Sequence, residues 1–385
     1  MPTQRIAWKE AAWIFVLSRL VIILITVIAV IRFPQAREAF ARDCARDPSC
    51  FLSWWHWDVL SFAGIAQNGY QSIQNTVFFP LWPVLLHGAA ALFGASLVGY
   101  YVAGLLLANL FFYLALVIFY LLLSQDFDQA VARKALFYLC FAPYALFFFA
   151  GYSESLFLLL CLAAFFFLQR ERYWLAGMSG FLAALTRSQG VLLVVPFLVV
   201  LLQRYWSQRQ HMTWRDILHA CSPLALIPLG VVVYMLYLWI AKGDPLAFST
   251  QEATFWHRHL TFPVVSLITA FKTFFHHEVF DLRLLNALDL GFTLIPLALL
   301  VLGWRRLPLS YSLFALAMLL FDLSYPQGIV EPLTAAPRYL MVIFPVFVLL
   351  AIWGKRPRLD RLILVLFLPL FAINVVLFVS HYWVS

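Results

Sequence analysis

Residues 1–33 of the chain are MPTQRIAWKEAAWIFVLSRLVIILITVIAVIRF. Basic residues come first, and an almost unbroken apolar run follows over residues 12–32. A cleavable signal peptide would have a shorter apolar core followed by a small-residue cleavage site, and this stretch shows neither. About 20 apolar residues are enough for a helix to cross the bilayer core. We therefore expect residues 12–32 to form a retained first membrane span.

The composition of the whole chain supports the same conclusion. Of its 385 residues, 64% are hydrophobic and 11% are charged, whereas a soluble domain has about 25% charged residues. This excludes a soluble globular protein and predicts an all-α polytopic membrane protein. The net charge of +8 is not a nucleic-acid signal here, because basic residues in such a protein mark its cytoplasmic face.

Further apolar runs bring the expected number of transmembrane helices to about eleven. They cover residues 97–123, 135–150, 153–169, 173–187, 190–205, 217–241, 286–304, 308–323, 338–353 and 362–383. With the N-terminus inside, every inside segment carries at least two basic residues. The positive-inside rule favours this arrangement over its inverse.

Two long outside loops are expected within what we take to be a single domain, 1–385. The first, 33–96, should carry interfacial helices, and the second is 242–285. The segment PLWPVLLHGAAALFG (80–94) is apolar but short, and we interpret it as interfacial or re-entrant. The alternative is a true short span.

Cysteine and histidine patterns leave two questions open. Cys44 and Cys50, in the first loop, form a disulfide in an oxidising compartment or remain free thiols. The second loop contains FWHRHL (255–260) and FFHHEV (274–279), whose imidazoles and carboxylate are ordinary metal ligands. No H-E-x-x-H spacing is present, so we expect interfacial helices there, no required cofactor and no metal ligands among the site residues. A divalent metal stays open.

Ionisable residues inside spans are functional candidates by default. Arg19 lies about a third of the way into the first span, and we expect it to snorkel back to the cytoplasmic headgroups. Asp289 and Asp322 lie near the outer ends of spans, where we expect them to reach water.

Five ionisable residues collect at the outer face in this topology: Asp58, Glu154, Arg187, Glu331 and Arg338. A cleft of mixed charge at one face of a helical bundle suits a substrate that carries a sugar and a phosphate. The alternative is that each residue caps or anchors a helix end.

Asp58 stands out because it follows three indole rings, those of Trp54, Trp55 and Trp57. An aspartate in water is a weak base with a pKa of about 4, and burial among the rings would make it more basic. The rings would also supply a stacking surface. Arg187 and Arg338 would supply cations for a phosphate. We expect His56 to be an interfacial residue, with a sugar contact as the alternative.

The chain contains neither a glycine fingerprint for dinucleotides nor a P-loop, so a sugar donor would arrive on a membrane lipid. Six motifs follow one another along the chain: SRL (18–20), WHWDVLSFAGIAQNGY (55–70), FFPLWPVLL (78–86), GYSESLF (151–157), LTRSQG (185–190) and PRYLMVIFP (337–345). This ordered set resembles the PIG-V family of mannosyltransferases.

The resemblance implies a GT-C fold with an extracytoplasmic active site and inverting transfer from a polyprenyl-phosphate sugar, usually a mannose lipid. Asp58 matches the acid of the family's W-D pair and would be the catalytic base. Trp57 and Tyr70 belong to the same motif and are expected to contact substrate, as are Glu154, Arg187, Glu331 and Arg338. Asp58 has no acidic neighbour of the kind many GT-C enzymes have.

The expected partners are the donor lipid, a lipid or glycan acceptor and membrane lipids. The expected location is a bacterial plasma membrane, or the endoplasmic reticulum if the source is eukaryotic. The main alternative function is a transporter or lipid flippase, which would show inverted repeats and broken helices at mid-membrane. A third possibility is a non-catalytic scaffold.

Overall fold

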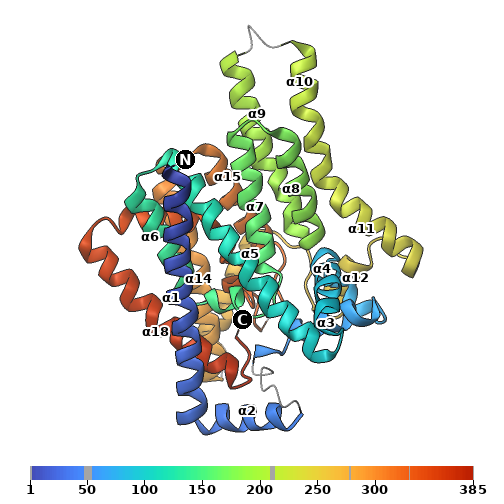
Figure 1. Cartoon of the computed structure of the whole chain (residues 1–385), viewed down its shortest axis with the longest axis vertical. Helices are drawn as coiled ribbons and strands as arrows, with labels where there is room; N and C mark the ends of the chain where they lie inside the picture. Colours follow the sequence, from blue (N-terminus) through green and yellow to red (C-terminus); the bar gives the residue numbers. More distant parts are fainter. Residues whose placement is uncertain (1, 47–53, 209–212, 277–278, 329, 385) are drawn as a thin grey trace. The chain divides into compact units, whose positions relative to one another are not determined.

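The computed structural model describes residues 2–46, 54–208, 213–276, 279–328 and 330–384. In these ranges the regular structure is helical (Figure 1), and the only β-type pairing is an isolated bridge between Arg258 and Gln327. The expected all-α class is confirmed. Cys50 lies outside the described residues, as do His277 and Glu278, so the pairing of Cys44 with Cys50 stays open.

Six described segments are long and apolar enough to cross a membrane: Gln4–Arg32, Leu97–Asp126, Ser188–Ser207, Leu218–Lys242, Leu282–Arg306 and Pro357–Val379. Six shorter apolar helices accompany them: Leu81–Phe93, Glu154–Gln169, Tyr173–Thr186, Pro263–Phe275, Leu309–Leu323 and Phe344–Trp353. The chain is therefore an integral membrane protein, as its composition predicts. The expected total of about eleven spans stays a prediction.

The chain divides into two compact units. The first unit comprises Met1–Gln71, Pro80–Leu162 and Leu350–Val384. Its helices are α1 (Pro2–Arg32), α2 (Pro34–Arg46), α3 (Asp58–Asn68), α4 (Leu81–Ala90), α5 (Leu97–Asp126), α6 (Gln129–Cys140), the start of α7 (Glu154–Gln169) and α18 (Pro357–Val379). Helix α1 packs against α5, α6 and α18, and α4 packs against α3 and α5. Helix α3 also packs against α5.

The second unit comprises Ser72–Phe79 and Ala163–Leu349. Its main helices are α8 (Tyr173–Thr186), α9 (Val194–Gln208), α10 (Trp214–Cys221), α11 (Leu226–Lys242), α12 (Ala247–Thr254), α13 (Pro263–His276), α14 (Phe280–Gly303), α15 (Leu309–Leu323), α16 (Ala336–Leu340) and the start of α17 (Phe344–Trp353). Helix α8 packs on α11, α9 on α15, and α13 on α14.

Glycines allow the close packing of α8 on α11 and on η6 (Ser222–Ala225), the 3-10 turn that precedes α11. A Cβ atom on Gly177 would lie 2.3 Å from the carbonyl oxygen of Pro223, and one on Gly230 would lie 2.5 Å from that of Phe181. No side chain fits at such distances, so the two helices approach to backbone contact.

Two expected spans are broken in the structure. The segment 135–150 divides into α6, which ends at Cys140, and a 3-10 turn, η4, over Ala145–Phe148. The segment 338–353 divides into α16 and α17. Pro143 stands at the first break, where proline lacks an N–H donor and disfavours helical geometry in the preceding residue. Pro345 is the second residue of α17, a first-turn position at which the missing donor is tolerated.

The long loops contain short helices. Helices α2, α3 and α4 lie within 33–96, and α12 and α13 lie within 242–285. With 10 residues, α4 has about half the length that a spanning helix needs. The interpretation of 80–94 as interfacial or re-entrant stays a prediction.

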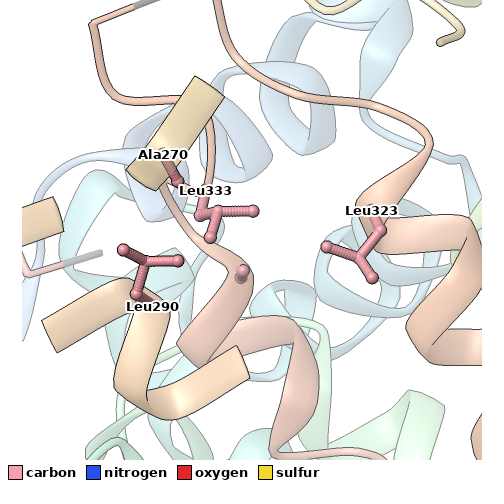
Figure 2. Close-up of a cluster of buried hydrophobic side chains, with 5 residues drawn as sticks. Ala270, Leu290, Leu323 and Leu333 are labelled. Carbon is pink, nitrogen blue, oxygen red and sulfur yellow. The ribbon is translucent and has the colours of Figure 1, made fainter. Parts of the chain in front are cut away.

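A small apolar core anchors the part of the second unit that carries Asp322 and Arg338. It comprises Ala270, Leu290, Leu323, Leu333 and Ala336 (Figure 2). Leu323 follows Asp322 at the end of α15, and Ala336 begins the short helix that carries Arg338. Burial of these apolar side chains therefore fixes both segments.

Candidate functional site

Asp58 is the first residue of α3, where the helix dipole favours a negative charge, and its side chain is half-buried. The preceding residue, Trp57, has φ 57° and ψ −130°. A left-handed φ is strained for a residue with a large side chain, and such strain persists only where the surroundings impose it. The Trp57 ring is 38% exposed and packs edge-on against Trp383 at 4.9 Å.

The other two indoles do not form an open stacking surface, so that expectation is wrong for them. Trp54 is 6% exposed, and its ring centroid lies 4.6 Å from that of Phe149. Trp55 is 4% exposed and lies 3.6 Å from Tyr101. Both rings pack into the interior of the first unit and hold the chain that leads into α3. Trp57 alone of the three remains available to a substrate.

His56 is a packing residue rather than an interfacial one. It is buried, and its Nε2 donates a hydrogen bond of 2.9 Å to the carbonyl oxygen of Phe378. Its ring also lies 4.4 Å from those of Phe378 and His381. The imidazole thereby ties the segment before Asp58 to the end of α18.

Tyr70 lies just beyond the other end of α3. Gly69 ends the helix with φ 71°, and Tyr70 is buried directly after it. His87 Nδ1 donates a hydrogen bond of 2.7 Å to the carbonyl oxygen of Ala66 in the last turn. Buried Trp54, Trp55 and His56 therefore hold the start of the helix that carries Asp58, and the exposed His87 bonds its last turn.

Glu154 is fully buried at the first position of α7. Three residues earlier, Gly151 approaches the Asp58 segment closely. A Cβ atom on Gly151 would lie 3.3 Å from Cγ1 of Val59 and 3.4 Å from the backbone of Gly104. Because Val59 follows Asp58, the structure packs the segment of one predicted acid against the segment of the other.

Arg19 does not snorkel to the headgroups, so that expectation is wrong. The side chain is 8% exposed, and its Nη2 donates a hydrogen bond of 3.3 Å to the carbonyl oxygen of Phe148. Its Cζ lies 4.7 Å from the ring centroid of Phe112 and 4.8 Å from that of Phe15. Aromatic faces attract a cation at such distances, and they hold the guanidinium within the first unit.

In the second unit, three arginines converge on one tyrosine. The Cζ atoms of Arg187, Arg258 and Arg338 lie 4.8, 5.4 and 5.7 Å from the ring centroid of Tyr339. We call these four residues the arginine cluster. The structure thus brings together the two arginines, Arg187 and Arg338, that the sequence singled out as phosphate ligands.

Arg258 was not among the predicted site residues, although it lies in the FWHRHL segment. One of its Nη atoms donates hydrogen bonds to Gln327 Oε1 at 3.1 Å and to the carbonyl oxygen of Thr334 at 3.0 Å. Its Nε lies 3.9 Å from a carboxylate oxygen of Glu252. The guanidinium is therefore fixed, and residue separations of 69 and 76 from these hydrogen-bond partners explain why no local pattern indicated it.

Two aspartates expected to reach water are instead enclosed. Asp289 is 4% exposed. At Asp322, Oδ2 is buried and has no hydrogen-bond partner among the described residues. The amide of Gln189 hydrogen-bonds this carboxyl group, which also lies in the field of Arg187 and Arg258. Gln189 Oε1 accepts from Arg187 Nε at 3.3 Å, so Asp322 belongs with the arginine cluster.

Glu331 lies in the connection that leads to α16. Its carbonyl oxygen accepts hydrogen bonds from the backbone N–H of Thr334 at 3.1 Å and from Thr334 Oγ1 at 2.9 Å. Ala335 then takes φ 67° immediately before the helix. This turn places Arg338, which is 6% exposed, in the arginine cluster.

The seven predicted site residues fall into both units. Asp58, Trp57, Tyr70 and Glu154 belong to the first, and Arg187, Glu331 and Arg338 to the second. That all seven serve one substrate stays a prediction. In the described ranges no three histidine, cysteine, aspartate or glutamate side chains gather as metal ligands.

Similarity to characterised proteins extends over much of the chain. It is similar to GPI mannosyltransferase 2 of Schizosaccharomyces pombe, with 27% identity over 224 residues that cover 54% of this chain and 48% of that protein. It is also similar to human GPI alpha-1,6-mannosyltransferase 2, with 34% identity over 152 residues, which are 36% of this chain and 30% of that protein. The matched segments thus span about half of these relatives' length or less.

Among solved structures, the apo oligosaccharyltransferase of Archaeoglobus fulgidus aligns with 95% of this chain and 56% of its own chain, with 13% identity and a TM-score of 0.44. The profile described as Mannosyltransferase (PIG-V) matches residues 9–239, a range that includes Asp58, Glu154 and Arg187. More than half of the sequence lies in that match, and the chain belongs to the PIG-V mannosyltransferase family.

Proposed function

We propose that this protein is a glycosyltransferase that moves a hexose, mannose above all, from a polyprenyl-phosphate donor to a hydroxyl group of a lipid or glycan acceptor on the extracytoplasmic side of the membrane. The observation that carries the proposal is the family match over residues 9–239. The fold supports it, because an integral membrane enzyme can draw both a lipid-linked donor and a lipid acceptor from the bilayer.

The chemistry requires a base and a group that stabilises the departing phosphate. In the proposed reaction the Asp58 carboxylate takes the proton of the acceptor hydroxyl, whose oxygen attacks C1 of the sugar. The bond between C1 and the phosphate oxygen breaks, and its electron pair leaves with the polyprenyl phosphate. Attack from the opposite side inverts the configuration at C1. The half-buried position of Asp58 beside the strained Trp57 supports this role, because strained residues cluster at functional sites.

The arginine cluster is proposed to bind the phosphate. Planar guanidinium groups match phosphate oxygens in geometry and charge, and three of them face one ring here. The leaving phosphate gains negative charge as its bond to C1 breaks. Fixed cations therefore stabilise the transition state more than they stabilise the bound donor. Arg258 belongs in this role beside Arg187 and Arg338.

The test compares two aspartates. Wild type, Asp58→Asn and Asp128→Asn are purified in lipid nanodiscs and given a synthetic polyprenyl-phosphate mannose together with a membrane lipid extract as the source of acceptor. Released polyprenyl phosphate and mannosylated product are then quantified. Asp128 is the control because it lies in an exposed ion pair with Lys355, in the connection between α5 and α6.

We expect Asp58→Asn to lower turnover by about 10²-fold or more and Asp128→Asn to match wild type. Equal turnover in wild type and Asp58→Asn would show that Asp58 is not the base. A wild type that consumes neither the mannose lipid nor its glucose analogue would contradict the proposed function itself.

A further inference from the structure

The connection between α6 and α7 is a buried stretch of largely irregular backbone. Between Phe141 and Ser153 the chain forms turns and the short helix η4, and nearly all of its residues are buried. Irregular backbone leaves carbonyl groups without the partners that a helix supplies, and an unpaired buried carbonyl is costly. Each such carbonyl therefore needs a donor from elsewhere in the fold.

Side chains from separate helices of the first unit supply these donors. The hydrogen bonds run from Arg19 Nη2 in α1 to Phe148 (3.3 Å), from Ser155 Oγ in α7 to Phe148 (3.3 Å), from Asn109 Nδ2 in α5 to Phe149 (3.1 Å) and from Trp82 Nε1 in α4 to Gly151 (3.2 Å). We call Arg19, Trp82 and Asn109 the carbonyl clamp. Three helices thus hold three carbonyl groups within residues 148–151, a stretch that ends three positions before Glu154.

Burying the charged side chain of Arg19 for this contact has a high desolvation cost. Its Nε and Nη1 are buried without a hydrogen-bond partner among the described residues. A neutral side chain of similar shape would avoid the desolvation of a charge. Ionisable residues within membrane spans are rare for this reason and mark function. The guanidinium also faces Phe112, whose ring stacks on that of Phe148 at 4.5 Å.

We infer that the carbonyl clamp positions the 148–151 backbone for the transfer reaction, and this inference rests on the proposed function. Two consequences follow from the contacts. The clamp sets where α7 begins, and therefore where the buried carboxyl group of Glu154 lies. It also holds Gly151 against Val59, the residue next to Asp58. Arg19, Trp82 and Asn109 are positioning residues that act through these two acids.

A matched pair of tryptophans isolates the effect of the hydrogen bond. Trp82 and Trp55 are both buried, with exposures of 0% and 4%. The N–H of Trp82 donates to Gly151, whereas that of Trp55 has no partner among the described residues. Trp82→Phe and Trp55→Phe remove the same atoms, but only the first removes a hydrogen bond from the clamp.

Two measurements are made on wild type and on both variants in nanodiscs. Hydrogen exchange of the peptide that covers 147–155 reports on the clamp without reference to activity. Turnover of polyprenyl-phosphate mannose, split into kcat and donor KM, reports on positioning. We expect Trp82→Phe to raise exchange in this peptide and to lower kcat about tenfold with donor KM little changed, since one hydrogen bond is worth about this factor. We expect Trp55→Phe, which keeps every hydrogen bond of the clamp, to leave exchange in this peptide unchanged.

Each contrary outcome has a separate meaning. Equal hydrogen exchange in the two variants would show that the Trp82 hydrogen bond does not hold the 148–151 backbone. Raised exchange in Trp82→Phe with wild-type kcat would overturn the positioning role. If wild type consumes no lipid-linked sugar, the proposed function fails, and the exchange data still decide whether the clamp exists.

Discussion

The Nη2 atom of Arg19 donates a hydrogen bond to the carbonyl oxygen of Phe148 over 3.3 Å, although 129 residues separate the two in sequence. An arginine in the first span is thereby part of the interior of the first unit and does not face the headgroups. The contact joins α1 to the connection that precedes Glu154. It links the SRL motif of α1 to the geometry of one of the acids of the site.

Arg19→Met should separate function from stability. Phe148 keeps the donor Ser155 Oγ, and the variant no longer buries a charge. We therefore expect a free energy of unfolding within about 1 kcal/mol of wild type or higher, together with a roughly tenfold loss of turnover. Thermal unfolding in nanodiscs and the donor assay measure the two quantities. A variant that loses several kcal/mol but keeps its turnover would assign Arg19 a purely structural role.

Arg258→Gln tests whether the third arginine acts on the donor phosphate. A hydrogen bond to a charged group is worth about 1.5–3 kcal/mol, so we expect donor KM to rise at least about tenfold. The control is Arg283→Gln, in the same unit, which removes an arginine whose Nε donates to the carbonyl oxygen of Phe274 at 3.1 Å. Similar KM values in the two variants would exclude Arg258 from phosphate binding.

The packing of α8 on α11 predicts opposite effects for two glycines. A Cβ on Gly177 would lie 2.3 Å from a backbone oxygen of Pro223, whereas one on Gly291 in α14 would meet nothing within 4 Å. We expect Gly177→Ala to lower the free energy of unfolding by about 1–3 kcal/mol and Gly291→Ala to raise it by up to about 1 kcal/mol. Denaturant unfolding in mixed micelles measures both, and a stable Gly177→Ala protein would show that the two helices do not meet as described.

Asp128 gives the fold a pH dependence that can be assigned to one group. The hydrogen bond from Lys355, followed by that from the backbone N–H of Val131, holds the pKa of Asp128 below its ordinary 3.8. Because the pKa is lowered in the folded state, the stabilisation is present at pH values above 3.8 and is lost as the pH falls through the folded pKa. The pair is exposed, so its contribution is small.

Two substitutions separate the cap of α6 from the ion pair. Asp128→Ala loses the hydrogen bond of 2.9 Å from Val131 N and should cost about 1 kcal/mol at pH 7. Asp128→Asn keeps a capping oxygen and should cost less than about 1 kcal/mol. The difference between wild type and Asp128→Asn should disappear when unfolding is measured below the folded pKa. A constant difference at all pH values would show that the charge of Asp128 contributes nothing.

Several site residues were predictable because local sequence carries their signal. Asp58, Glu154, Arg187 and Arg338 stand out as polar groups in short motifs between apolar runs. The structure places Arg187 and Arg338 at the same tyrosine. Arg258 and Asp322 were not predicted to belong to the site, because their partners, Thr334 and Gln189, lie far away in sequence. A polar residue in an apolar sequence can be recognised from the sequence, but the residue that it contacts is known only from the tertiary structure.

The sequence by itself determined that this is an all-helical membrane protein, because a hydrocarbon core requires long apolar runs with their backbone hydrogen bonds closed inside helices. It did not reveal that the expected spans 135–150 and 338–353 are each broken into two helices. Only the tertiary structure decided which carbonyl Arg19 binds, that Trp54 and Trp55 face inward, and that three arginines share Tyr339. Those contacts join residues distant in the chain, and side-chain packing selects them by shape and by the need to pair every buried polar group.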